Sequence, residues 1–153
     1  MKTQVLTKEL LQVAEIDIVY NKKKKGVTKI KESREAVEIF RKVWEPDLNF
    51  RERAYVMYLN RANNVMAVQN ISFGGLDGTV VDNRILFGTA LKMLASGIIL
   101  AHNHPTGNLQ PSQIDKNLTK KVKEGGALLD IVLLDHVIIT EDSYTSFADE
   151  KIL

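Results

Sequence analysis

The 153-residue sequence contains no cysteine, and this absence excludes three kinds of chemistry. A disulfide framework, a zinc finger held by thiolates and a cysteine nucleophile all require thiols. Any metal site in this chain must therefore be built from histidine, aspartate or glutamate.

Long apolar runs and a strong charge of one sign are also missing. The longest apolar stretch, near Gly97 to Ala101, is far too short to cross a bilayer, and the first eight residues have no apolar core of signal-peptide length. Lysine and arginine number 21 against 19 for aspartate and glutamate, and the resulting net charge of +2 is too small to indicate nucleic-acid binding by itself. We expect a cytoplasmic protein without a membrane segment.

The composition, 44% hydrophobic and 26% charged, is that of an ordinary globular protein with one core, so we expect a single domain over residues 1–153. Residues 1–46 are interpreted as a divergent N-terminal extension of strand and helix. A short strand is predicted around Ile16 to Tyr20, and the lysine run Lys22 to Lys25 is interpreted as a solvated turn. Helical spacing from Ser33, a plausible cap, to Trp44 predicts a helix that places Trp44 in the core.

Two β-rich runs, Arg53 to Leu59 and Val65 to Phe73, are joined by turn residues and predict an antiparallel hairpin. Asp82 can cap a helix that Gly97 closes. The strand that follows, Ile98 to Ala101, is apolar on both faces, which is typical of the middle of a sheet covered by helices on each side.

A further helix is predicted from Ser112 to about Glu124, with Gly125 and Gly126 as its end. Strands are expected near Leu128 to Leu134 and His136 to Thr140. Together these elements predict an α/β fold in which helices flank a mixed β-sheet.

The residues that carry chemistry cluster after the buried strand. His102 and His104 are two positions apart, so on extended chain their rings point to the same side and can share one ion. The loop from Pro105 to Pro111 can bring the next helix start, with Asp115, back toward the strand end. Two imidazoles and one carboxylate leave an open position on a tetrahedral zinc ion, which is the pattern of a catalytic rather than a structural site.

A hydrolase also needs a group that takes a proton from water and returns it to the leaving amine, and Glu52 is the candidate. Ser112 could donate its hydroxyl to the oxyanion that forms on the attacked carbonyl. Each residue has a simpler interpretation. His-x-His occurs by chance in loops, and Ser112-x-x-Asp115 is also the signature of a helix capping box that needs no metal. Glu52 alone would be a solvated acid.

The conjunction of these residues behind one buried strand favours the metal site over the simpler interpretations. His136 is interpreted as a satisfied structural histidine rather than a fourth ligand.

Glutamate, then His-x-His, seven residues, serine, two residues and aspartate resembles the JAMM motif of MPN-domain metallopeptidases. The run His102-Asn103-His104-Pro105-Thr106-Gly107 and the later Leu134-Asp135-His136-Val137-Ile138 resemble bacterial RadC-type proteins, over roughly residues 47–147. The resemblance implies a cytidine-deaminase-like α/β fold. It also implies zinc (Zn2+) on His102, His104 and Asp115, with Glu52 polarising a water molecule on that ion and Ser112 as the motif serine.

Two functions from different classes follow from this resemblance. The first is a zinc-dependent hydrolase that cleaves amide or isopeptide bonds in a peptide substrate. The second, which the RadC label suggests through DNA repair, is a non-catalytic, DNA-associated accessory module in repair or mobile-element pathways. The longer RadC-type proteins carry a helix-hairpin-helix region ahead of this domain, and the first 46 residues lack its pattern of paired glycine-centred hairpins. A nuclease of the His-Asn-His type is disfavoured because its three residues would here be consecutive, with Asn103 pointing the other way.

Overall fold

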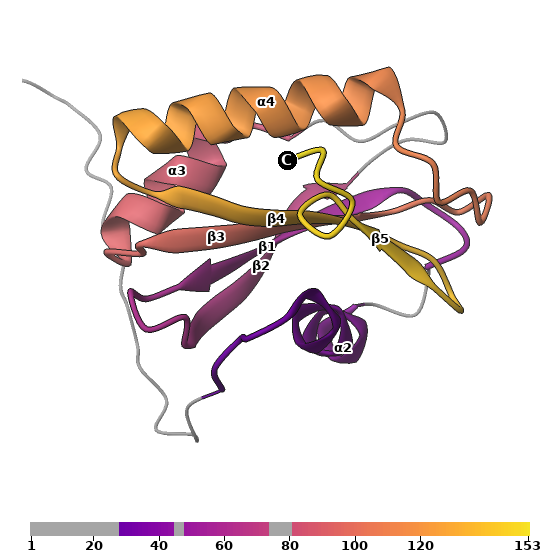
Figure 1. Cartoon of the computed structure of the whole chain (residues 1–153), viewed down its shortest axis with the longest axis horizontal. Coiled ribbons are helices and arrows are strands. Elements are labelled where there is room, and N and C mark those ends of the chain that lie inside the picture. Colours follow the sequence, from indigo (N-terminus) through magenta and orange to yellow (C-terminus); the bar gives the residue numbers. More distant parts are fainter. Residues whose placement is uncertain (1–27, 45–47, 74–80) are drawn as a thin grey trace, which may run out of the picture.

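The computed structural model describes residues 28–44, 48–73 and 81–153. Along the chain the elements are α2 (Ser33–Val43), β1 (Arg53–Leu59), β2 (Val65–Phe73), α3 (Asn83–Lys92), β3 (Gly97–Asn103), α4 (Gln113–Leu128), β4 (Val132–Ile139) and β5 (Tyr144–Ser146) (Figure 1). The predicted strand at Ile16 to Tyr20 and the lysine turn at Lys22 to Lys25 lie outside these ranges. Within the described ranges, no helix is long and apolar enough to span a membrane.

The five strands form one mixed sheet in the order β2-β1-β3-β4-β5. β3 and β4 run parallel, whereas β1 is antiparallel to both of its neighbours and β5 is antiparallel to β4. The α/β fold with a mixed, helix-flanked sheet is therefore confirmed. The parallel pair is joined through α4, as a parallel connection requires a crossover.

The sheet buries both of its faces, and the strands alternate residues between two cores. Val56 and Leu100 point to one core with α3 and α4, whereas Met57 and Ala101 point to the other core with α2. Figure 1 shows α3 and α4 on one side of the sheet and α2 on the other. Because β3 lies in the middle, it is buried along its whole length, which confirms its predicted position.

Several local signals in the sequence act as expected. The two hairpin strands have the bounds that the sequence predicts, and the Asp82 side chain accepts a hydrogen bond from the Arg84 amide at the start of α3. Trp44 is buried and packs against Tyr55 with ring centroids 4.4 Å apart. One cap is wrong: Glu32 occupies the N-cap of α2 without a side-chain cap bond, while the Ser33 hydroxyl contacts that of Ser146.

The predicted helix ends are also wrong at the glycines. α3 stops at Lys92, ahead of Gly97, which is instead the first residue of β3. α4 continues through Gly125 and Gly126 to Leu128, and the left-handed residue that follows it is Asp130, with φ 55°. The glycines serve packing: a Cβ on Gly125 would lie 2.9 Å from the Phe87 ring, and one on Gly126 would overlap the Ile131 carbonyl oxygen.

The last strands also differ from the prediction. Leu128 belongs to α4, and a single strand, β4, covers the region where two were expected. The edge strand β5 was not predicted. It is only three residues long and carries too little pattern to be recognised.

Replacing Gly126 with alanine should lower the free energy of unfolding by about 1–3 kcal/mol, because the new methyl group meets backbone that cannot move aside easily. The matched control is Gly88→Ala, in the exposed part of α3, where an added Cβ meets nothing within 4 Å. This control should be stabilising by up to about 1 kcal/mol, since alanine is the better helix former. Urea unfolding measures the stability of both variants. An equal change in stability for Gly126→Ala and Gly88→Ala would show that the close contact at Gly126 does not matter.

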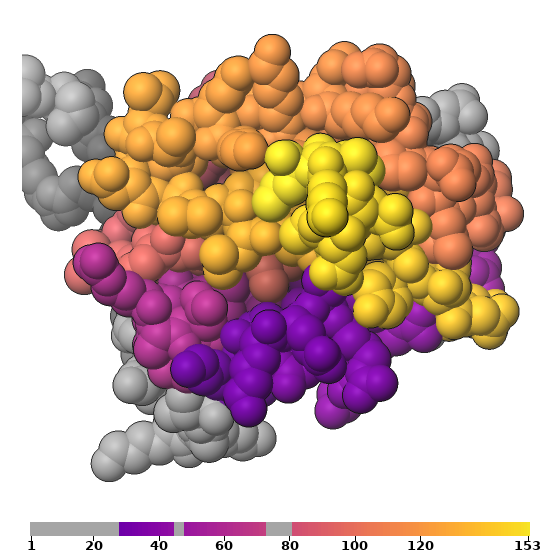
Figure 2. All heavy atoms as spheres, viewed as in Figure 1, coloured from indigo at the N-terminus to yellow at the C-terminus, as the bar shows by residue number. Residues whose placement is uncertain are grey.

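The C-terminal segment, drawn in yellow in Figure 2, lies between α4 and α2 on the side of the edge strand β5. Phe147 is fully buried, and its amide donates to the His136 carbonyl. The carboxylate of Asp135 holds this segment in place, because it accepts hydrogen bonds from the amides of His136 and Ala148 and from the Ser146 hydroxyl. Burial raises the pKa of Asp135, and these hydrogen bonds only partly offset that effect.

Because its folded-state pKa is raised, Asp135 contributes stability below its unfolded pKa of about 3.9 that is lost as the pH rises through the folded value. Asp135→Asn removes this titration. The variant should therefore gain stability relative to the wild type as the pH rises from acid to neutral. Urea unfolding of both proteins at each pH gives the free energy of unfolding of the variant minus that of the wild type. A value that falls with rising pH would contradict the raised pKa of Asp135.

Candidate metal centre

Strand geometry brings the two histidines of the predicted site together at the end of β3. His102 is 1% exposed and points to the α4 side of the sheet, and His104 follows directly after the strand. Their Nε2 atoms are 3.0 Å apart. A turn then reverses the chain, with the Gly107 amide donating to the His104 carbonyl and Gly107 in the left-handed region at φ 78°, where glycine is favoured.

The N-terminus of α4 supplies the carboxylate. Ser112 caps this helix in a capping box with Asp115, so the simpler interpretation of the Ser-x-x-Asp spacing is also correct. Asp115 Oδ2 accepts from both the amide and the hydroxyl of Ser112, at 2.7 Å each. Asp115 Oδ1 lies 3.1 Å from His102 Nε2, and Oδ2 lies 3.6 Å from His104 Nε2. The cap therefore aims the acid at both imidazoles.

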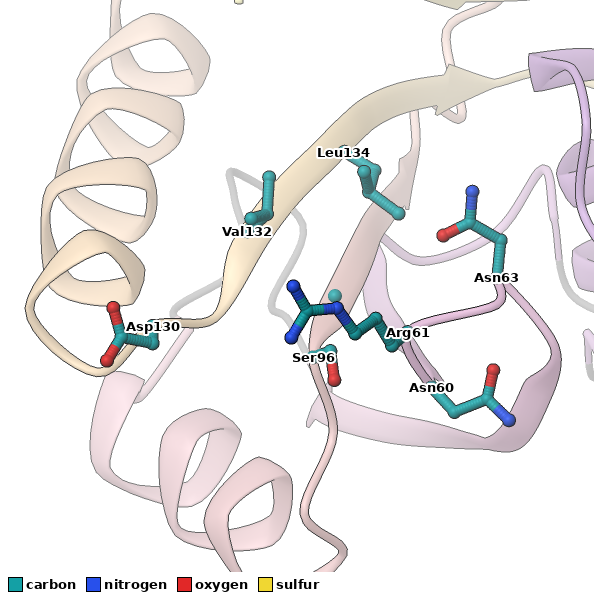
Figure 3. A pocket seen from close by; sticks show the side chains of 8 residues that line it. Asn60, Arg61, Asn63, Ser96, Asp130, Val132 and Leu134 are labelled. Atoms are coloured by element: carbon teal, nitrogen blue, oxygen red, sulfur yellow. The ribbon is translucent and has the colours of Figure 1, made fainter.

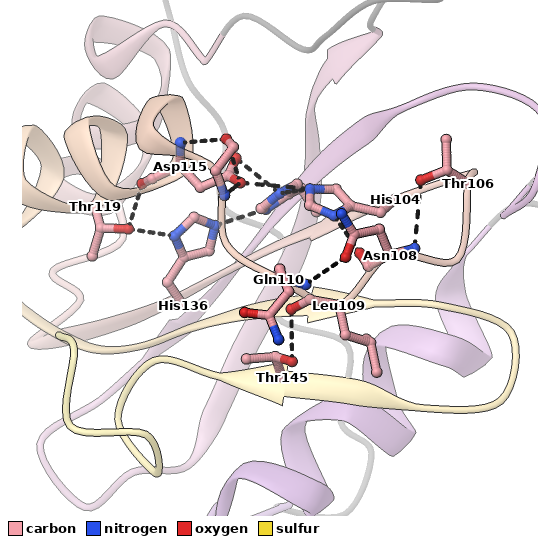
Figure 4. A network of polar contacts seen from close by, with 11 residues as sticks. His104, Thr106, Asn108, Leu109, Gln110, Asp115, Thr119, His136 and Thr145 are labelled. Carbon is pink, nitrogen blue, oxygen red and sulfur yellow. Dashed lines mark hydrogen bonds and ion pairs between the residues drawn. The ribbon is translucent and has the colours of Figure 1, made fainter.

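Hydrogen bonds at the far side of each ring determine which nitrogen carries the proton. His104 Nδ1 lies 2.6 Å from the Asn108 carbonyl oxygen, which can only accept, so this nitrogen donates (Figure 4). His102 Nδ1 lies 2.8 Å from His136 Nε2. Burial lowers the pKa of His136 well below its ordinary value, and the nearby His102 lowers it further. The ring is fully buried, and its nitrogens contact His102 and Thr119 rather than a carboxylate that could pair a positive charge. Because a buried unpaired charge is costly, His136 is a neutral imidazole with one N–H.

The hydrogen bonds of Thr119 determine which ring nitrogen of His136 carries the proton. Its hydroxyl donates to the Asp115 carbonyl at 2.7 Å, so its oxygen must accept from His136 Nδ1, 2.6 Å away. The neutral His136 ring then has its lone pair on Nε2 and accepts from His102 Nδ1–H. The side chains of His102, Thr119 and His136 are all buried. Figure 4 shows the hydroxyl of Thr119 beside the His136 ring.

The consequence is a convergence of lone pairs. Nε2 of His102, Nε2 of His104 and Oδ1 of Asp115 face one another with no proton fixed between them by the surrounding structure. Such a cluster requires a positive charge, either a proton or a metal ion. Hydrogen bonding to Asp115 raises the pKa of His104. Burial alone would raise the pKa of Asp115, but contacts with His102, His104 and Ser112 hold it far below its usual range.

Glu52 lies directly before β1 and beside this cluster. One carboxylate oxygen of Glu52 and one ring nitrogen of each of His102 and His104 all lie within 4.8 Å of one another. Glu52 is half-buried, whereas Asp115 is buried, so Glu52 is the carboxylate that solvent can reach. The structure thus brings together all five residues that the sequence singles out.

Asn103, which separates the two histidines, points to the opposite side and holds the chain around Glu52. Its Oδ1 accepts from the Arg53 amide at 2.7 Å, and its Nδ2 donates to the carbonyls of Arg51 and Leu48 at 2.8 and 2.6 Å. Asn103 is fully buried. The backbone on both sides of Glu52 is therefore tied to the residue between the two imidazoles.

Replacing Asn103 with alanine should lower the free energy of unfolding by about 2–4 kcal/mol, because one buried amide and two carbonyls lose their partner. Asn117→Ala is the control, since Asn117 makes an exposed side-chain hydrogen bond on α4. The control should change stability by less than about 0.5 kcal/mol. Urea unfolding measures the stability of both variants. An Asn103→Ala variant as stable as Asn117→Ala would show that the three hydrogen bonds of Asn103 contribute nothing to stability.

Sequence reasoning missed the supporting residues rather than the central ones. His136 was interpreted as a satisfied structural histidine, and it is buried and hydrogen-bonded, but its partner is His102. Thr119 carries no motif signal. Only the helical spacing of four residues from Asp115 could have pointed to it.

A depression lies at the end of the sheet opposite to the histidine cluster, around the β1–β2 turn and the starts of β3 and β4 (Figure 3). Arg61, Ser96 and Asp130 are among its lining residues. None of the five predicted site residues lines it, so it is separate from the cluster at the carboxyl end of β3.

Comparison with known proteins agrees with this geometry. A family model described as RadC-like JAB domain matches residues 30–152, and the chain belongs to that family, a JAMM-related domain. The match includes α2, which lies in the predicted N-terminal extension.

Curated relatives share the name UPF0758 protein. The one from Flavobacterium johnsoniae is 50% identical over 101 residues, which cover 66% of this chain and 44% of the relative. Those from Porphyromonas gingivalis and Chlorobaculum parvum are 43% and 40% identical, each over 67% of this chain and 46% of the relative. The chain thus spans less than half the length of these relatives.

Proposed function

We propose that this chain is a zinc-dependent hydrolase of the JAMM type that cleaves amide or isopeptide bonds in a peptide substrate. The observation that carries the proposal is the convergence of the Nε2 atoms of His102 and His104 with Asp115 Oδ1, while each imidazole donates its other N–H to a protein partner. Neutral imidazoles oriented in this way are metal ligands.

The donor set fits zinc. Nitrogen and carboxylate oxygen are zinc ligands, and a set of three protein ligands is the catalytic pattern. His102, His104 and Asp115 would hold the ion. A bound zinc ion acts as a Lewis acid that makes water a nucleophile near neutral pH and polarises a carbonyl.

Glu52, which has a carboxylate oxygen within 4.8 Å of a ring nitrogen of both His102 and His104, is the proposed proton carrier, and two features support this role. Glu52 is reached by solvent, and no hydrogen bond within the described ranges occupies its carboxylate. A carboxylate oxygen of Glu52 can therefore take a proton from the attacking water and pass it to the leaving amine.

Ser112 is the proposed donor to the oxyanion. Its hydroxyl proton is directed at Asp115 Oδ2, so this role requires that hydrogen bond to break during the reaction.

The test separates metal binding from chemistry. Glu52→Gln should keep zinc at one equivalent per chain, as measured by elemental analysis after dialysis, yet lower the hydrolysis rate by about 10²- to 10⁴-fold, the usual contribution of a positioned acid–base group. The substrates are fluorogenic peptides with a lysine isopeptide bond or an ordinary amide bond. Gln113→Ala, at an exposed position of α4, is the control and should match the wild type.

A wild-type chain without zinc, or a Glu52→Gln variant with unchanged cleavage, would overturn the proposal. Salt-dependent binding to duplex DNA without cleavage would point instead to the DNA-associated accessory role.

A further inference from the structure

A circuit of four polar contacts, three of them hydrogen bonds, starts and ends on Asp115. The Asp115 carbonyl accepts from the Thr119 hydroxyl, whose oxygen accepts from His136 Nδ1, and His136 Nε2 accepts from His102 Nδ1. His102 Nε2 then faces Asp115 Oδ1 at 3.1 Å. The protons in this circuit can be assigned because it begins at a carbonyl oxygen, which cannot donate.

We propose that Thr119 and His136 are positioning residues, which hold His102 in its Nδ1–H tautomer and so present the Nε2 lone pair to the metal. The inference rests on the proposed function for the identity of the ion. It adds two residues to the site, and of these His136 is not in the group Glu52, His102 and His104 whose ligand atoms lie within 4.8 Å of one another.

Packing alone does not require these polar groups. Thr119 is 3% exposed and His136 fully buried. Apolar residues are buried beside them on the same elements, Val122 one turn after Thr119 on α4 and Ile138 two residues after His136 on β4. His136 stacks on Phe147, with ring centroids 4.6 Å apart and an interplanar angle of 25°, a contact that an aromatic hydrocarbon could also make. Buried polar groups cost stability unless every one is satisfied. Here each is satisfied only with the orientation that leaves His102 Nε2 free.

The circuit also predicts what happens when it is opened. In Thr119→Val the Nδ1–H of His136 loses its acceptor in a buried position. The neutral ring can relieve this by moving its proton to Nε2, where it confronts the Nδ1–H of His102. His102 must then carry its own proton on Nε2, and the lone pair for the metal is lost. Thr119→Ser keeps the hydroxyl and should keep the circuit.

Two measurements test the inference. Long-range ¹H–¹⁵N spectra of the metal-free chain, at a pH above the pKa of free imidazole, report the tautomer of each of the three histidines. Competition with a chromogenic chelator gives the zinc affinity. Thr145→Val is the matched control, because the Thr145 hydroxyl also donates to a backbone carbonyl, that of Leu109 in the loop after His104, but lies outside the circuit.

We expect Nδ1–H tautomers for His102 and His136 in the wild type. Zinc affinity should fall by about 10- to 100-fold in Thr119→Val, the usual effect of losing a partner behind a ligand, and stay within about threefold of the wild type in Thr119→Ser and Thr145→Val. His136→Gln, which keeps an acceptor for His102, should lose less affinity than His136→Phe, which keeps only the stacking on Phe147.

Wild-type His102 with a proton on Nε2 and none on Nδ1 would overturn the inference without any variant having to fold. An unchanged zinc affinity in a folded Thr119→Val chain would overturn it as well. A wild-type chain that has the expected tautomers but binds no zinc would instead overturn the proposed function, because the spectra are recorded without metal.

Discussion

The site depends on one electrostatic constraint, the approach of two imidazole nitrogens to 3.0 Å with a carboxylate oxygen beside them. Lone pairs at this distance repel one another unless a positive charge lies among them. The arrangement is held by structure that lies outside the cluster: the central strand carries His102, the turn at Gly107 orients His104, and the capping box of α4 directs Asp115. The fold thus holds two imidazole nitrogens and a carboxylate oxygen close together. Their mutual repulsion costs free energy, and a cation bound among them would offset that cost.

Two buried acids, Asp115 and Asp135, have opposite net pKa shifts, although burial by itself raises the pKa of both. Asp115 is held in its charged form by the imidazoles and the Ser112 hydroxyl, whereas Asp135, which faces only neutral donors, has a raised pKa. The difference is the presence of groups that can carry a positive charge. The lowered pKa of Asp115 therefore agrees with the cation site proposed there, whereas Asp135 supports the C-terminal segment.

The sequence was sufficient for the parts of the fold that local rules determine. Two β-rich runs joined by turn residues defined β1 and β2 to the residue, and Asp82 was recognised as a cap because its hydrogen bond is local. Gly125 and Gly126 misled the prediction, since their role depends on contacts with Phe87 and Ile131 that only the folded chain reveals. In the same way, the histidines and acids follow a linear motif, whereas the partnership of Thr119 with His136 spans 17 residues and joins a helix to a strand.

Asn103 gives the site a mechanical property. Because one residue lies between the two imidazoles and also grips the peptide groups on either side of Glu52, a displacement of the strand end carries the acid and both rings as a unit. Bending of the sheet would then shift the site as a whole and preserve its internal spacings.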